Sequence, residues 1–552
     1  MDERQDSPRA WSLWLLPPFL VGAVLRLWNL PDQILGGDEI HAVRAAVNLP
    51  LREILTSYQQ TDNCIPLTAL YKGLMGWGVP LSEMVVRLPV VLCGLAALLA
   101  MPLAFAGKVD RRVTILFAWL LAVSPSLVLY SRIARSYLPI VVFGFGAVVA
   151  FEAWWRTRSR RAGLAYVVFA ALAVWFHLGA GPFVASPFLF AAGDLALHRE
   201  ERWRKLRDLV LLGLGLCLAF ALFLVPSRDS LARLVQGKRQ EQSIAWGDLL
   251  PDLLRLQAGT ARPWLAAIFW GAAVAGLVLL IRRSPRLGLY TATLAAGHVA
   301  GLLVLSPMGL ANPVIFGRYV LVILPFVLLW VAVAFSQMRA AGGLLVAALA
   351  LGGPFAEPVY RSSSFVHHND FVAFLGERAS APSLPAFYET LEEGDVVEFP
   401  WHTIWQYNRA FYAYQRVHGR RVIVSTSQRL LFRPGLRMKN AVAPDPEALC
   451  ASGAKYLIVH LRIGREEDRV LPAEGLVHTE DAYRLRRSLR RDAEVLISKV
   501  RRLWGRPVYS DGSIRVWDLG AVCRPGGGTQ EATPAARPKA AKTIPRKKPG
   551  GR

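Results

Sequence analysis

Cysteine is scarce in this 552-residue chain, and the few cysteines are not arranged for metal or redox chemistry. There are five, and no two of them form a C-x-x-C pair. This spacing excludes the common zinc-binding and thioredoxin-like motifs. The adjacent histidines His367 and His368 lack the helical or hairpin spacing of a dependable metal site. The sequence therefore predicts no metal centre.

Acidic residues are also few. The chain has 40 of them against 64 lysines and arginines, which gives a formal net charge of +24. Such a surplus is typical of nucleic-acid-binding proteins. Here, however, much of it lies in short basic clusters between apolar runs, and such clusters more often report membrane topology. We therefore expect no nucleic-acid partner.

Long apolar runs dominate what is present, and hydrophobic residues make up 53% of the chain. A helix needs about 20 apolar residues to cross a bilayer. Runs of this kind lie near 11–28, 82–106, 113–131, 138–155, 164–178, 181–197, 208–225, 263–281, 287–306, 319–335 and 341–356. We predict a polytopic α-helical membrane protein with about eleven transmembrane helices.

The basic loops predict how these spans are oriented. Clusters of arginine and lysine fall in every second loop, at 108–112, 156–161, 199–207, 282–286 and 339. The positive-inside rule places such loops in the cytoplasm. Residues 1–10 are then a cytoplasmic N-terminus, too acidic for a cleaved signal. Residues 11–356 are predicted to form a transmembrane domain, and its loop 29–81 is predicted to face outward.

After residue 356 the long apolar runs give way to shorter, strand-like runs. Strand-like runs appear at Asp395–Phe399, Arg421–Ser425, Lys455–His460 and Ser513–Leu519. Helical or turn-rich stretches separate them, so residues 357–523 are predicted to form an extracytoplasmic α/β domain. An oxidising compartment there would permit Cys450 to pair with Cys523. Residues 524–552, rich in Pro, Gly, Ala, Lys and Arg, are predicted to be a disordered basic tail.

A basic amphipathic helix is predicted between Asp481 and Leu503. Apolar residues recur there at helical spacing, with seven arginines around them, at positions 484, 486, 487, 490, 491, 501 and 502. Such a helix either lies on anionic lipid or packs on the outer domain. The pattern alone does not choose between the two.

An acidic pair, Asp38-Glu39, follows the first apolar run and leads into a short predicted helix, Ala42 to Asn48. Acidic residues are favoured at a helix N-terminus in any protein, so one interpretation is a helix cap. The other is catalytic. A partly buried carboxylate beside His41, at the mouth of a span, has what a general base needs to deprotonate a hydroxyl.

Four further stretches follow this pair, in outward loops and in a fixed order. They are Asp62-Asn63-Cys64-Ile65-Pro66-Leu67-Thr68-Ala69-Leu70-Tyr71, Ser82-Glu83-Met84-Val85-Val86-Arg87-Leu88-Pro89, Tyr130-Ser131-Arg132-Ile133-Ala134-Arg135-Ser136-Tyr137 and Phe316-Gly317-Arg318-Tyr319. As an ordered set they resemble the GT-C superfamily of polyprenyl-phosphate-dependent glycosyltransferases. The likeness is to the protein O-mannosyltransferase-like (family 39-like) and aminoarabinose-transferase-like branch.

The resemblance implies a GT-C fold and an enzyme that works on the outer side of the membrane. Such an enzyme moves a sugar from a polyprenyl-phosphate donor to a hydroxyl acceptor in a lipid, glycan or protein of the envelope, usually with inversion. The leaving group is already a stable phosphate anion, so one base suffices and no carboxylic acid is needed to protonate it. Asp38 matches the acidic position of the family and is the candidate base. Glu39 is its neighbour or a helper that binds the acceptor.

Arginines at the outward ends of spans are candidates for holding the phosphate of the donor, because a guanidinium fork can donate two hydrogen bonds to phosphate oxygens. Arg135 fits the family pattern best, and Arg132, Arg318 and Tyr137 accompany it. For each arginine taken alone, snorkelling at the membrane interface is the alternative. Four further residues are weaker candidates for substrate contact, and each could instead have a structural role: His41, Lys72, Arg87 and His177.

No cofactor is clearly implied. Related sequences often have an acidic residue near Ile133, and this chain has none, so a divalent cation is not supported. Two other functions stay open. One is a transporter or flippase for lipid-linked saccharides, although the spans have almost no charge in their interior. The other is an inactive GT-C homologue that serves as a scaffold.

The predicted topology can be tested with single cysteines in a background that lacks the native thiols. A cysteine at Ser362 should react with an impermeant maleimide in intact spheroplasts, and a cysteine at Ser159 should react only after lysis. The opposite labelling pattern would place the acidic pair in the cytoplasm, where nucleotide sugars are the available donors.

Overall fold

The computed structural model describes residues 13–28, 30, 37–61, 63–79, 81–197, 202–238, 246–260, 262–307, 310–311, 313–338, 342–344, 386–400, 422–423, 446–461 and 479–523. The chain divides into two compact units. The first is built mainly from residues 1–383, and the second from residues 384–429, 437–465 and 483–552. Each unit is described by itself.

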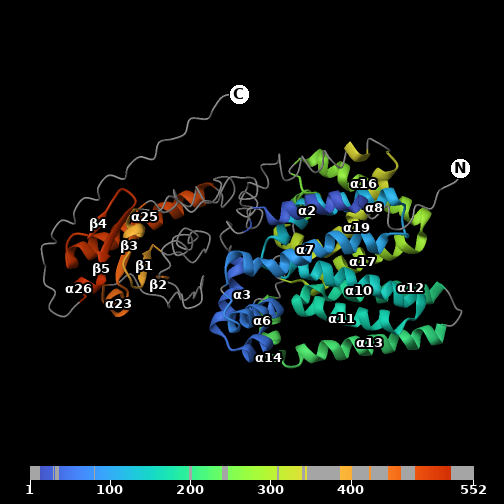
Figure 1. Cartoon of the computed structure of the whole chain (residues 1–552), viewed down its shortest axis with the longest axis horizontal. Coiled ribbons are helices and arrows are strands. Elements are labelled where there is room, and N and C mark those ends of the chain that lie inside the picture. Colours follow the sequence, from blue (N-terminus) through green and yellow to red (C-terminus); the bar gives the residue numbers. More distant parts are fainter. Residues whose placement is uncertain are drawn as a thin grey trace. The chain divides into compact units, whose positions relative to one another are not determined.

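The first unit is helical (Figure 1). Its α-helices are α2 (Leu16–Leu27), α3 (Gly37–Asn48), α4 (Leu51–Thr56), α5 (Tyr58–Thr61), α6 (Ile65–Gly76), α7 (Glu83–Phe105), α8 (Arg111–Val123), α9 (Pro125–Ser131), α10 (Tyr137–Thr157), α11 (Arg160–Phe176), α12 (Gly181–Leu197), α13 (Arg202–Leu224), α14 (Arg228–Lys238), α15 (Trp246–Ala258), α16 (Pro263–Arg283), α17 (Pro285–Leu305), α18 (Pro313–Tyr319) and α19 (Leu324–Ser336). Short 3₁₀ turns η1 (Leu13–Leu15), η3 (Leu178–Ala180) and η4 (Val320–Ile323) precede α2, α12 and α19.

The long apolar helices confirm a polytopic membrane protein. Seven of the described helices are long and apolar enough to cross a bilayer, and α8 with α9 adds an eighth if this bent pair is one span. Ten of the predicted spans coincide with helices, from α2 to α19. The eleventh, 341–356, lies almost wholly outside the described residues, so the number eleven stays a prediction.

Two neighbouring spans are joined by a very short connection, and one span is bent. His177 has an extended backbone between the end of α11 and η3, and α12 begins at Gly181. Ser124 separates α8 from α9, Pro125 begins α9, and the two helices meet at a bend of 54°. Proline has no N–H and cannot continue the helical hydrogen-bond ladder, so carbonyls at the end of α8 need partners from elsewhere.

Small residues allow the helices of the bundle to approach closely. α10, α11 and α13 lie side by side (Figure 1), and α16 packs on both α17 and α19. At the last of these contacts, a Cβ on Gly276 would lie 1.7 Å from the carbonyl oxygen of Trp330. Only glycine fits there, which is typical of helix packing in membranes.

The second unit contains a five-stranded mixed sheet. Its strands are β1 (Val396–Phe399), β2 (Val422–Ile423), β3 (Tyr456–His460), β4 (Tyr509–Ser510) and β5 (Ile514–Asp518), in the order β2-β1-β3-β5-β4. β1 is parallel to β2 and β3, whereas β5 is antiparallel to β3 and β4. Also in this region are η7 (Ala386–Thr390), α23 (Pro446–Ala451), α25 (Thr479–Trp504) and α26 (Leu519–Val522). The predicted α/β fold is confirmed.

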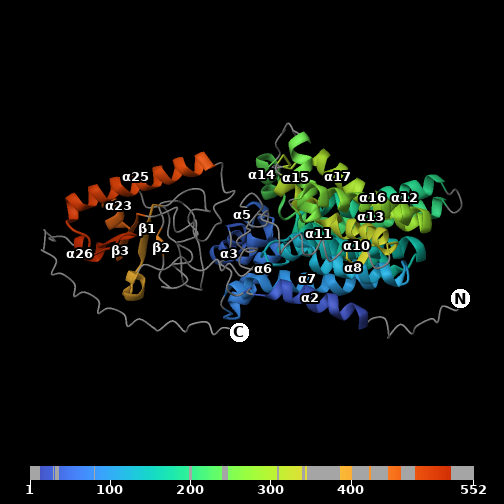
Figure 2. The ribbon, with the colours of Figure 1, turned by 90° about the horizontal axis from the view of Figure 1, so that it is seen from above.

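The two faces of this sheet differ. Alternate strand residues, among them Val397, Leu457 and Trp517, pack with the buried apolar side of α25, which runs along the sheet in Figure 2. Glu398 and His460 are fully buried on neighbouring strands, and Glu398 Oε2 lies 2.5 Å from His460 Nε2.

The predicted strand positions are confirmed for β1, β2, β3 and β5, but β4 was not predicted because a two-residue edge strand has no readable alternation.

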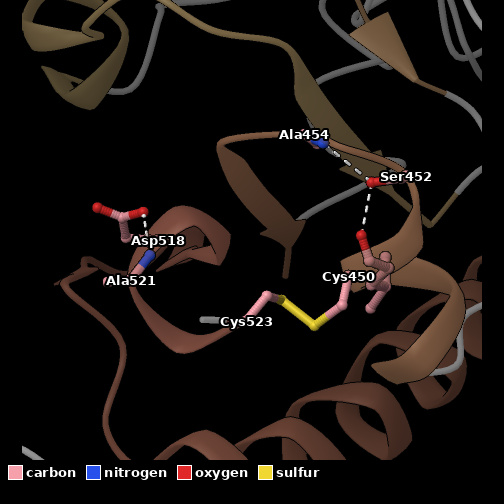
Figure 3. The surroundings of a disulfide bond; sticks show 7 residues. Cys450, Ser452, Ala454, Asp518, Ala521 and Cys523 are labelled. Carbon is pink, nitrogen blue, oxygen red and sulfur yellow. Dashed lines mark hydrogen bonds between the residues drawn. A yellow bond between two sulfur atoms is a disulfide. The ribbon is translucent and has the colours of Figure 1, made fainter. Parts of the chain in front are cut away.

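Cys450 and Cys523 form a disulfide with a Cα–Cα distance of 5.4 Å (Figure 3). The bond ties the end of α23 to the residue that follows α26, across 73 positions of sequence. The geometry thus brings together the two cysteines for which pairing was predicted to be permitted.

Candidate functional site

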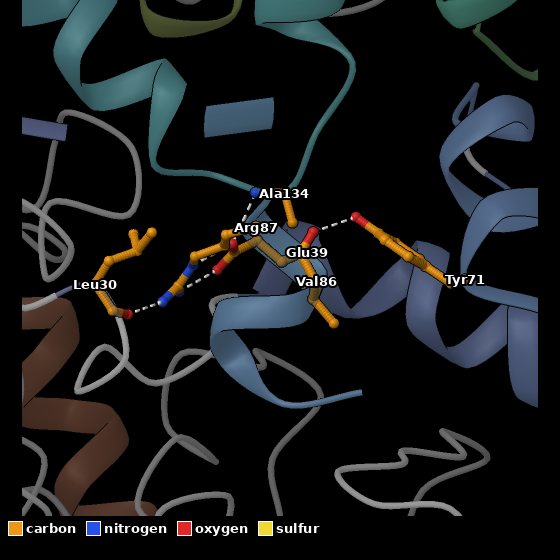
Figure 4. Close-up of polar contacts among 6 residues, drawn as sticks. All are labelled: Leu30, Glu39, Tyr71, Val86, Arg87 and Ala134. Atoms are coloured by element: carbon orange, nitrogen blue, oxygen red, sulfur yellow. Dashed lines mark hydrogen bonds and ion pairs between the residues drawn. The ribbon is translucent and has the colours of Figure 1, made fainter. Parts of the chain in front are cut away.

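Glu39 lies in the first turn of α3 and is fully buried. Its carboxylate accepts two hydrogen bonds from Arg87 of α7, from Nε to Oε1 at 2.9 Å and from Nη2 to Oε2 at 2.8 Å (Figure 4). Both side chains have no exposed surface. A buried carboxylate and guanidinium stabilise a fold only as a hydrogen-bonded pair, because each alone would be a charge removed from water.

The pair also holds two pieces of backbone. Glu39 Oε1 accepts the backbone N–H of Ala134 at 2.8 Å, and Arg87 Nη1 donates to the carbonyl of Leu30 at 3.3 Å. Beside it, the Tyr71 hydroxyl donates to the carbonyl of Val86 at 2.6 Å (Figure 4). Burial, with the nearby Cys64 and Glu39, holds the pKa of Tyr71 well above its ordinary value. Tyr71 therefore stays a neutral donor.

Two buried arginines tie α2 to the bent pair α8 and α9. Arg26 of α2 donates to the carbonyls of Leu121 and Ala122, each at 3.1 Å, and to the Ser131 hydroxyl at 3.0 Å. In return, Arg132 Nη1 donates to the carbonyls of Leu25 and Arg26, at 3.1 and 3.0 Å. Arg26 thus satisfies carbonyls at the end of α8, and Arg132, at the end of α9, satisfies carbonyls at the end of α2. Together they fix the start of the segment 132–136.

Arg135 and Arg318 meet at one aromatic ring. The guanidinium of Arg135 lies 6.0 Å from the centre of the Tyr137 ring, and that of Arg318 lies 5.6 Å from it. Arg318 Nη1 also donates to the Tyr137 hydroxyl at 3.2 Å. Two cations are therefore held near one ring by cation–π attraction, although they come from segments 183 positions apart.

Other aromatic groups surround this ring. Tyr137 contacts Tyr130, with ring centres 5.2 Å apart, and His177, at 6.2 Å. His177 in turn contacts Tyr319, at 5.7 Å. The short connection between α11 and α12 thus places the ring of His177 between those of Tyr137 and Tyr319. We define Arg135, Tyr137, His177 and Arg318 as the arginine–tyrosine cluster.

The loop 62–64 and the segment 132–136 are also joined. The Sγ of Cys64 lies 3.1 Å from the Ser136 Oγ, and the Ser136 hydroxyl donates to the carbonyl of Asn63 at 3.4 Å. The segment 132–136 therefore contacts the Glu39–Arg87 pair at Ala134 and residues Asn63 and Cys64 at Ser136, and it carries Arg135 between them.

The structure places the other sequence candidates on elements of the same unit. Asp38 is the second residue of α3, and its side chain lies outside the described residues. His41 is half-buried on α3, and Lys72 is half-buried on α6. Arg132 lies against the carbonyls of α2, and Arg87 pairs with Glu39. Among the described residues, no group of histidines, cysteines and carboxylates is arranged to hold a metal ion.

Sequence reasoning missed three polar residues that position this region. Arg26 is described above. His298 of α17 is buried, with Nε2 2.9 Å from the carbonyl of Tyr319. Gln257 of α15 donates to the carbonyl of Gly317 at 2.9 Å. The latter two fix the backbone on either side of Arg318. An ionisable residue inside an apolar run was the signal available for Arg26 and His298.

No protein-family model and no curated protein matches the sequence. Solved structures do match. ArnT from Cupriavidus metallidurans in the apo state aligns with a TM-score of 0.54 and 14% identity, over 95% of this chain and all of the ArnT chain. ArnT bound to undecaprenyl phosphate aligns with a TM-score of 0.55 and 13% identity, over the same shares of the two chains. At this identity the likeness establishes a common fold.

The buried ion pair can be tested by removing one charge or both. Glu39→Gln leaves the Arg87 charge buried without its counter-charge, which typically costs about 3–5 kcal/mol of stability. The double variant Glu39→Gln/Arg87→Met removes both charges and should melt at a higher temperature than Glu39→Gln in detergent. Asp229→Asn, at a carboxylate whose side chain is 84% exposed, is the matched control and should melt like the parent. Equal melting of Glu39→Gln and this control would show that the pair contributes nothing.

Proposed function

We propose that this chain, whose fold is that of the GT-C superfamily, is a membrane glycosyltransferase. It would transfer a sugar from a polyprenyl-phosphate donor to a hydroxyl acceptor, such as a lipid, glycan or protein, at the outer side of the cell inner membrane. The two ArnT alignments confirm the fold that the sequence resemblance implied. One of those ArnT structures has undecaprenyl phosphate bound, which supports the choice of donor class.

The observation that carries the proposal is the convergence of Arg135 and Arg318 on Tyr137. As the bond from the sugar to the phosphate breaks, negative charge grows on the phosphate oxygens. Two guanidinium groups that are already in place can stabilise this charge without reorganising. Guanidinium is suited to this task because it presents paired donors in a fixed plane.

The contacts of Glu39 lead us to propose different roles for the two acidic residues, Asp38 and Glu39. Its carboxylate holds Arg87 and the Ala134 N–H, so we assign Glu39 to positioning Arg135 through the adjacent backbone. Asp38 is then the proposed base, which takes the proton from the acceptor hydroxyl as the hydroxyl oxygen attacks the anomeric carbon. Attack opposite to the departing phosphate inverts that carbon. Arg87 would act through Glu39 and not on the donor.

The assignment of the base predicts the effect of Asp38→Asn. Loss of a general base typically lowers the rate by about 10²–10⁴-fold. In a deletion strain, the variant should fail to restore the envelope glycan, and mass analysis should show that the lipid-linked donor accumulates. Asp229→Asn, the same change at an exposed position, should restore the glycan. Restoration by Asp38→Asn at normal protein levels would rule out Asp38 as the base.

The role of the phosphate ligand predicts the effect of Arg135→Lys. An ammonium group keeps the charge but loses the planar fork, so transfer should fall by about 10²-fold. Arg228→Lys, at a side chain that is 79% exposed, is the matched control. Turnover of purified protein should be measured at saturating and at limiting lipid donor. Equal turnover of the two lysine variants would mean that Arg135 contributes only surface charge.

A further inference from the structure

The exposed side of α25 is basic. Its apolar residues, including Ala493, Leu496 and Val500, are buried against the sheet. Packing on the outer domain therefore accounts for one side of the helix. From Arg490 onward, six basic residues are exposed on the rest of the helix or just beyond its end, and we define them as the basic face: Arg490, Arg491, Lys499, Arg501, Arg502 and, after the helix, Arg506.

Acidic residues do not balance this face. Between Arg490 and Arg506 the sequence has only Asp492 and Glu494. Glu494 Oε1 accepts a hydrogen bond from Arg490 Nε at 2.9 Å, an i to i+4 pair on the surface of the helix. The stretch thus keeps a surplus of four positive charges, and a surface pair of this kind is worth little in itself.

Aliphatic side chains are exposed among these basic residues. Val495 is 61% exposed, Leu503 57% and Val508, just beyond the helix, 45%. Val495 lies between Arg491 and Arg502 on one line of the helix surface, because positions i, i+4 and i+11 share a face. A surface that mixes cations with aliphatic groups is typical of helices that lie at a lipid headgroup boundary.

We propose that the basic face docks on the anionic headgroups of the bilayer that holds the helices of the same chain. The guanidinium and ammonium groups would bind phosphate oxygens, and Val495 and Leu503 would enter the boundary of the acyl region. The tether to the membrane-spanning helices keeps the lipid surface at high effective concentration, so weak individual contacts suffice.

Other occupants fit less well. A second copy of the chain would bring an identical positive face and be repelled. An acidic glycan matches the charge, but it offers no apolar phase for the exposed aliphatic side chains. The lipid surface matches both features.

The test uses the full chain in nanodiscs, with a fluorophore on Val495→Cys. The background carries Cys93→Ser and Cys217→Ser, since Cys64 is buried and the other two cysteines form the disulfide. The nanodiscs contain lipids with a doxyl quencher. Quenching should be at least about twofold stronger in phosphatidylglycerol mixtures than in pure phosphatidylcholine, and about 0.5 M NaCl should abolish the difference.

Three variants sharpen the result. Arg491→Gln/Lys499→Gln/Arg502→Gln should reduce the quenching to the phosphatidylcholine level. Glu494→Gln removes an acidic group from the same helix surface, so it should increase the quenching. A fluorophore on Glu393→Cys, in the turn before β1, should not respond to lipid charge.

Several outcomes would overturn the proposal. They are quenching that does not depend on lipid charge, quenching that survives the triple substitution, and an equal response of the fluorophore at position 393. Cross-linking of Val495→Cys between copies in proteoliposomes would assign the face to a second copy instead. None of these measurements depends on glycosyl transfer, so they are separate from the test of the enzyme.

Discussion

The buried ion pair between Glu39 and Arg87 is the contact on which the candidate site depends. It joins α3, which carries the acidic pair, to α7, and through the Ala134 N–H it also holds the segment that carries Arg135. Glu39 and Arg87 can be buried only together, because either charge alone would be unsolvated. The pair therefore ties the position of α3 to that of α7 and to that of the segment 132–136.

The arginines of the candidate site divide into two groups once their partners are known. Arg26, Arg87 and Arg132 satisfy carbonyls or a carboxylate inside the unit. Arg135 and Arg318 instead meet at the ring of Tyr137. The first group supplies hydrogen bonds to carbonyls at helix ends and to the buried carboxylate of Glu39. The second group lies next to the segments that these hydrogen bonds hold in place, and this is why we assign it to the donor phosphate.

In the second unit, one side of α25 packs on the sheet and the other side is exposed to solvent. The apolar side of α25 completes the core of the sheet, and the disulfide between Cys450 and Cys523 joins two segments that border the same core. The outward side of α25 is not used by this packing. Its charge and exposed aliphatic groups are what a bilayer surface would select.

The sequence by itself was enough to predict the membrane class, most of the spans and the strands. These features are local, because each apolar run must satisfy its own backbone hydrogen bonds in lipid and each buried strand needs its own alternation or apolar run. The resemblance to the GT-C superfamily was likewise readable from the order of short motifs, and it proved right for the fold. The two-residue strand β4 is too short to leave such a local signature, whereas the break near His177 was visible as the gap between the predicted spans 164–178 and 181–197.

The partners of the polar residues were decided only by the tertiary structure. Arg87, Arg132, Arg135 and Arg318 look alike in sequence, since each is an arginine near the end of a predicted span. Glu39 and Arg87 are 48 positions apart, and Arg135 and Arg318 are 183 positions apart. Which charge meets which partner depends on how the helices pack and where α8 breaks. Because the cost of a buried charge is set by the groups around it, no pattern within one helix could have revealed it.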